Sequence, residues 1–165
     1  MLPASAYGYL RRHWKSKSSP AGILPIKLLA AIFNIAMKTS TSISRILLGF
    51  IYLVFGLDYY LHLIPYQPNH TGAAAAFKDG LTAAGYFYPM MKSIQIIGGI
   101  SLLINRYAPF SAVVLFPISI NVFLFHTILV PSGWFMGVLL IVPNLFLGYA
   151  YRKYYTGMFV RKARV

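Results

Sequence analysis

Ser44–Pro65 reads SRILLGFIYLVFGLDYYLHLIP, and this stretch decides the fold. Between Arg45 and Pro65 lie 19 residues that include one acid, Asp58, and one imidazole, His62. A helix of that length is about 29 Å long, close to the hydrocarbon thickness of a bilayer. Arg45 stands at one end as a headgroup anchor, and the other end carries tyrosines typical of an interfacial belt. The stretch therefore predicts a membrane-spanning helix.

The composition of the whole chain agrees with a membrane protein. Its 165 residues have room for one domain, and they are 58% hydrophobic and 10% charged. Soluble domains are about 25% charged, and one of this size could not bury so much apolar surface. The chain has no cysteine, which excludes a disulfide framework, a thiol nucleophile and any metal site built on thiolates.

Three further apolar segments are predicted to cross the membrane, at residues 86–104, 109–130 and 135–151. The loop before the first of them, residues 66–85, contains a short helical segment. Small residues let neighbouring helices approach closely. We therefore expect helix packing at four glycines of the first two spans: Gly49, Gly56, Gly98 and Gly99.

The N-terminal region differs from the rest of the chain. Residues 1–20 are a basic arm, and residues 21–37 are apolar except for Lys27 and Asn34. With Lys38 and Thr41 these polar residues fall on one helical stripe, which predicts an amphipathic helix lying on the membrane surface. A signal peptide is the alternative, and whether residues 21–37 lie on or span the membrane stays open.

The predicted fold class is all-α, a bundle of four transmembrane helices with an N-terminal amphipathic interfacial helix. Its predicted divisions are residues 1–42 for the arm and interfacial helix, 43–155 for the transmembrane domain and 156–165 for a basic cytoplasmic tail.

Positive charge predicts the orientation. With four spans and both termini inside, only Lys78 and Lys92 of the 15 Lys and Arg residues lie outside, together with both acids, Asp58 and Asp79. Cytoplasmic loops carry such an excess of basic residues, so the net charge of +13 indicates orientation and not a nucleic-acid partner. The basic ends are expected to dock on anionic lipid or an acidic partner through Arg11, Arg12, Lys15, Lys17, Arg161, Lys162 and Arg164.

Ionisable side chains from distant parts of the sequence fall at the same outer depth of the predicted spans. Such residues are costly in a membrane and often mark a site. They predict an outer polar pocket formed by Asp58, His62, Lys92, Gln95, Asn121 and His126. A purely structural function is the alternative, in which Asp58 pairs with Lys92 to hold two helices together. We expect no resident metal or cofactor, although a quinone headgroup or a haem on His62 and His126 would also fit this layer.

No catalytic motif is visible in the chain. A Walker motif, a dinucleotide fingerprint, an HExxH pair and a Ser/His/Asp arrangement are all absent from the sequence. We therefore expect no catalytic residues.

Several short motifs resemble the DoxX-like family over residues 44–155. They are RILLGFIYLVFGL at 45–57, GAAAAF at 72–77, AAGYF at 83–87, IQIIGG at 94–99, NVFLFH at 121–126 and YAYR at 149–152. The resemblance implies a four-helix bundle in the bacterial inner membrane. Family members include a subunit of a thiosulfate:quinone oxidoreductase, proteins of redox or oxidative-stress complexes, and relatives that resemble membrane-protein chaperones. The family often has Glu where this chain has Gln95, which weakens a proton-coupled or redox function.

The expected function is that of a small integral inner-membrane accessory subunit or assembly factor of a larger membrane complex, without catalysis of its own. A quinone-linked or redox subunit that uses the outer pocket is one alternative, and a small-solute transporter is another. The partner subunits and the oligomeric state stay open.

Overall fold

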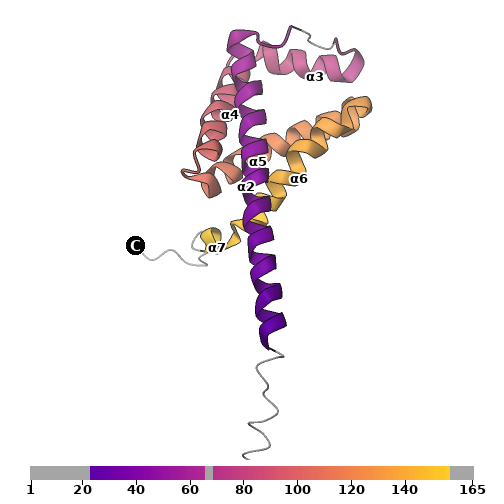
Figure 1. The fold of residues 1–165 in the computed structure, drawn as a ribbon. Helices are drawn as coiled ribbons and strands as arrows, with labels where there is room; N and C mark the ends of the chain where they lie inside the picture. The colour runs from indigo at the N-terminus through magenta and orange to yellow at the C-terminus, as the bar shows by residue number, and fades with distance from the viewer. Residues whose placement is uncertain (1–22, 66–68, 157–165) are drawn as a thin grey trace, which may run out of the picture. The chain divides into compact units, whose positions relative to one another are not determined.

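The computed structural model describes residues 23–65 and 69–156, and these form helices joined by turns, without a strand (Figure 1). The long helices are α2 (Ile23–Leu61), α4 (Phe87–Leu103), α5 (Ala108–Leu124) and α6 (Trp134–Ala150). The shorter elements are α3 (Gly72–Ala83), the π-helix η2 (Phe125–Leu129), the 3-10 turn η3 (Pro131–Gly133) and α7 (Arg152–Tyr155). The all-helical prediction is confirmed for this part of the chain.

Three helical segments are long and apolar enough to cross a membrane: Pro25–Leu61, Ala108–Leu129 and Pro131–Ala150. A membrane protein is therefore the class that the structure supports. The helix α4 has 17 residues, fewer than the 20 residues of the shortest of these segments.

The helix α2 is continuous, whereas the sequence predicted separate helices at 21–37 and 46–64. The intervening residues 38–45 are polar apart from Ile43, but they include no glycine or proline, and serine or threonine can remain within a helix. The helix ends at Leu61 because His62 adopts a left-handed backbone conformation, with φ of 52°. The helix therefore ends three residues before the predicted end of the first span.

The described residues fall into two units, which meet between residues 39 and 40. The helix α2 contributes to both, and each unit is described by itself. The predicted basic arm and the end of the basic tail lie outside the described residues.

The core of the second unit is formed by leucines, two alanines and one tyrosine from four helices. Its largest fully buried apolar side chains are Leu48 and Tyr52 of α2, Leu102 of α4, Leu115 of α5 and Leu147 of α6. The outer faces of the same helices expose large apolar side chains, for example Ile97 and Phe110 at 69% and 65%. Exposed aliphatic and aromatic faces are expected where a helix bundle meets lipid.

The four glycines predicted to pack helices lie at helix contacts. A Cβ atom on Gly99 would lie 2.8 Å from the carbonyl oxygen of Gly49, so the α2 and α4 backbones touch there. A Cβ on Gly56 would lie 2.7 Å from a side-chain carbon of Ile96, and one on Gly98 would lie 2.9 Å from Leu115. The absence of side chains at these positions lets α4 pack against both α2 and α5.

Candidate functional site

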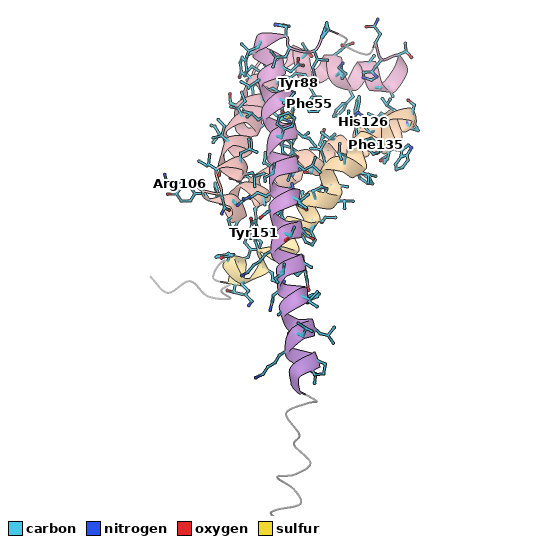
Figure 2. The ribbon with its side chains drawn as sticks, viewed as in Figure 1. Phe55, Tyr88, Arg106, His126, Phe135 and Tyr151 are labelled. Carbon is cyan, nitrogen blue, oxygen red and sulfur yellow. The ribbon has the colours of Figure 1, made fainter. Side chains whose placement is uncertain are left out.

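The candidate site lies at the end of the bundle next to α3, which we call the α3 end. Here the hydroxyl of Tyr60 at the end of α2 donates to the Pro89 carbonyl oxygen of α4 over 3.1 Å. The rings of Tyr59 and Tyr88 stack with centroids 6.2 Å apart. Figure 2 shows Tyr88 at this end and Tyr151 toward the other. Tyrosines at the end of α2 therefore join it to α4.

A first cavity at the α3 end, which we call the polar cavity, has a volume of about 470 Å³. It is lined by Asp58, Tyr59, His62, Lys78, Thr82, Gly85, Tyr88 and Lys92. Three of the six predicted pocket residues therefore meet here. The sequence analysis did not include Lys78 of α3, because the packing of a surface helix cannot be placed from its sequence alone.

Asp58 has a local structural function in this cavity. Its Oδ1 atom accepts a hydrogen bond of 2.7 Å from the backbone N–H of Ile64, which satisfies a donor just beyond the helix end. Its negative charge also acts on the ammonium group of Lys92. Asp58 thus shapes the turn after α2 and contributes charge to the cavity.

A second cavity, which we call the interior cavity, has a volume of about 430 Å³. It contains three predicted pocket residues, Lys92, Gln95 and His126. The rest of its lining is mostly aliphatic, aromatic or thioether: Ile51, Tyr52, Phe55, Ile64, Met91, Val122, Met136 and Leu140. The single predicted pocket is therefore divided, because α2, α4, α5 and α6 enclose its inner part.

Lys92 lines both cavities. Its Nζ atom donates a hydrogen bond of 2.9 Å to the carbonyl oxygen of Phe55, one turn before Asp58 on α2. An ammonium group has three protons, so Lys92 can also donate to a molecule in either cavity.

Asn121 is exposed and lines a third cavity of about 270 Å³ between α3 and the bundle. His126 and His70 also line this cavity, and the ring of Phe125 contacts both histidine rings with centroids 5.2 Å and 5.4 Å away. Desolvation lowers the pKa of His70, and the charges of Lys78 and His126 lower it further. His70 is therefore more easily kept neutral near pH 7.

The π-helix η2 determines the position of His126. The wider π turn rotates its side chains relative to α5, and π-helical turns occur often at functional sites. The Nδ1 atom of His126 lies 2.9 Å from the Val122 carbonyl oxygen, which fixes the ring. A Cβ on Gly133 would lie 2.6 Å from the ring, so the turn into α6 leaves space for this imidazole.

A polar network in the core was missed by the sequence analysis. The Asn144 amide donates to Ser119 Oγ over 2.7 Å, and Ser119 Oγ lies 2.6 Å from the Tyr52 hydroxyl. The Tyr52 hydroxyl also reaches the Leu115 carbonyl oxygen at 3.3 Å. The one signal in the sequence is Asn144 itself, because an amide in the middle of an apolar span needs a partner.

Within residues 23–65 and 69–156, no three His, Asp or Glu side chains gather closely enough to hold a metal ion. His62 lines the polar cavity and His126 the interior cavity, so the two histidines of the alternative haem site do not share a cavity. The basic residues predicted to dock on lipid, at positions 11–17 and 161–164, lie outside the described residues.

Comparisons of the chain with models of protein families, with curated proteins and with solved structures find no match. The DoxX-like resemblance therefore stays a prediction.

Proposed function

We propose that this chain is a four-span membrane protein of DoxX-like type that serves as a non-catalytic subunit or assembly factor of a larger membrane complex. In this proposal α2, α4, α5 and α6 cross the bilayer. Including α4 is supported by its contacts, since α4 packs between α2 and α5 through Gly99 and Gly98. A helix of 17 residues is about 26 Å long, near the thickness of the hydrocarbon core.

The distribution of charge supports a cytoplasmic location for the end of the bundle opposite α3. Arg45 of α2 lies close enough to Tyr151, just after the end of α6, for its positive charge to act on the tyrosine hydroxyl. Figure 2 shows Arg106 and Tyr151 away from the α3 end. Arg152 and Lys153 follow directly, whereas the α3 end has equal numbers of acids and lysines in Asp58, Asp79, Lys78 and Lys92. A basic side facing the cytoplasm fits the positive-inside rule and the proposed inner-membrane location.

The observation that carries the subunit function is the first part of α2. This part, residues 23–39, lies in the first unit. Large apolar side chains in the first unit, including Ile26, Leu29, Ile32, Phe33 and Ile35, are 55–67% exposed. A contiguous exposed apolar segment marks a membrane or protein contact. We assign it to a contact with another membrane subunit.

Photo-crosslinking tests this assignment. A photoreactive amino acid is placed at Ile32, and a matched control is placed at Val142 of α6, which is 55% exposed like Ile32. In native membranes we expect Ile32 to crosslink to one discrete protein that mass spectrometry identifies, while Val142 crosslinks to lipid. If Ile32 gives only lipid adducts, the subunit function is wrong.

A quinone-linked or redox subunit is the second candidate function, and the interior cavity favours it. A cavity of about 430 Å³ falls in the range of small-molecule sites and would accommodate a quinone ring. A haem absorption band, or quinone extracted in equal amount to the purified protein, would favour this function over the first.

A further inference from the structure

The interior cavity has the dimensions and lining of a site for a lipid-soluble molecule. Its volume of about 430 Å³ lies within the range of about 300–1,000 Å³ typical of small-molecule sites. Phe55, Met91 and Met136 line it from three different helices. Methionine side chains are flexible and adapt to ligands of different shape. The lining therefore suits a hydrocarbon chain or ring.

One polar atom in this lining has no partner. Gln95 is 4% exposed, and its Oε1 atom is buried without a hydrogen bond in the described structure. A buried acceptor without a donor is costly, more so inside a membrane, where water cannot supply the bond. Asn144, the other buried amide of the bundle, does have a bond within the protein, to Ser119. The contrast indicates that a molecule other than the chain supplies the donor to Gln95.

The neighbouring polar groups narrow the chemistry of that molecule. Lys92 has further protons to donate besides the one in its hydrogen bond to Phe55. The Nδ1 atom of His126 is bonded to the Val122 carbonyl oxygen, so the Nε2 atom of this ring is the one that can bond to a ligand. A carboxylate would place its lone pairs against those of Gln95. A hydroxyl group instead donates and accepts, so it pairs with the Gln95 amide in either orientation.

We propose that the interior cavity binds a lipid-soluble alcohol or phenol, whose hydroxyl group bonds to Gln95 and whose hydrocarbon part packs on Phe55, Met91 and Met136. This site does not depend on the subunit contact of α2, so crosslinking at Ile32 and ligand binding can fail independently.

The test compares two probes that differ only in the hydroxyl proton, 4-hexylphenol and its methyl ether 4-hexylanisole. The protein is reconstituted in nanodiscs, and empty nanodiscs correct for partition into lipid. Binding is measured from the saturable rise in the thermal unfolding midpoint as probe is added. Because the ether cannot donate to Gln95, we expect the phenol to bind about tenfold more tightly.

Two variants link this preference to Gln95. Gln95→Leu removes the amide, and because it also removes a buried unpaired polar group, we expect a protein at least as stable as the wild type that binds both probes equally. Asn121→Leu is the matched control, since this amide is exposed and lies outside the interior cavity. It should keep the tenfold preference. If Gln95→Leu fails to fold, the unbranched Gln95→Met takes its place. Equal binding of both probes to the wild type, or a preference that survives without Gln95, would overturn the proposal.

Discussion

Tyr52, Ser119 and Asn144 illustrate how single polar residues are accommodated in this apolar bundle. Asn144 donates to Ser119, and one assignment of the remaining protons lets Ser119 donate to Tyr52 and Tyr52 to the Leu115 carbonyl oxygen. Every group in this chain of bonds then has a partner. Gln95 lies in the same bundle without such a partner for its Oε1 atom. At the residue scale, this difference distinguishes a structural polar group from a candidate binding group.

Gly99 gives a prediction at the same scale. An added methyl group in Gly99→Ala would lie 2.8 Å from the Gly49 oxygen and 2.9 Å from the Leu53 nitrogen, and these backbone atoms cannot move without separating α2 from α4. We expect the free energy of unfolding to fall by about 1–3 kcal/mol, as for other overpacked cores. Chemical unfolding in detergent measures it.

The control for this substitution is Gly148→Ala in α6, where an added Cβ would meet no atom within 4 Å. It removes a helical glycine without crowding, so stability should stay constant or rise by up to about 1 kcal/mol. Equal losses in the two variants would show that the contact between α2 and α4 is not the cause.

At the scale of elements, the pairing of α2 with α4 organises the candidate site. Close backbone approach at Gly99 is accompanied by hydrogen bonds from Tyr60 to Pro89 and from Lys92 to Phe55. These contacts position Lys92 at the wall of both cavities. The same pairing brings the charge of Asp58 close enough to act on Lys92.

A double-mutant cycle tests the electrostatic coupling between these two residues. Asp58→Asn removes the charge but retains an oxygen that can accept from Ile64, while Lys92→Met removes the ammonium group. We expect the double variant to lose less stability than the sum of the two single losses, by about 0.5–1 kcal/mol. Once one charge of the pair is gone, removing the other no longer breaks an attraction between them. Thermal or chemical unfolding in one detergent measures all four proteins.

Asp58→Asn combined with Lys153→Met is the matched cycle. Lys153 lies in α7, outside the polar cavity that contains Asp58. The stability loss of this double variant should therefore equal the sum of the losses of its two single variants. Additive losses in the Asp58 and Lys92 cycle as well would mean that the two charges are independent.

At the scale of the whole molecule, the proposal of four spans fixes which turns share a side of the membrane. The turn between α4 and α5 and the end of α7 should face the cytoplasm, and η3 should face the opposite side. The chain has no cysteine, so a single introduced cysteine reports one position without background.

Labelling with a membrane-impermeant maleimide tests this arrangement in variants Ser132→Cys, Asn105→Cys and Thr156→Cys. We expect Ser132→Cys to react in intact cells, and the other two only after the membrane is permeabilised. Reaction of Ser132→Cys and Asn105→Cys from the same side would mean that α5 does not cross. A reversal of all three would keep the spans and invert the orientation.

The sequence by itself determined the helices and most of their ends, because those depend on local properties. Apolar runs of membrane length predicted α4, α5 and α6 to within one or two residues, apart from the π-helix η2 that ends the 109–130 run after α5. The prediction for α2 differs from the structure at two points, the continuity of the helix through residues 38–45 and the left-handed backbone of His62. Both are local properties of the chain, but hydropathy does not report them.

Tertiary structure alone decided how the predicted pocket residues are grouped. The sequence put Asp58, His62, Lys92, Gln95, Asn121 and His126 at one depth, but it could not give the rotation of each helix about its axis. That rotation is set by contacts between distant residues, such as Gly49 with Gly99 and Gly98 with Leu115. It turns Gln95 inward and leaves Asn121 exposed, and it divides one expected pocket into a polar cavity and an apolar one that share Lys92.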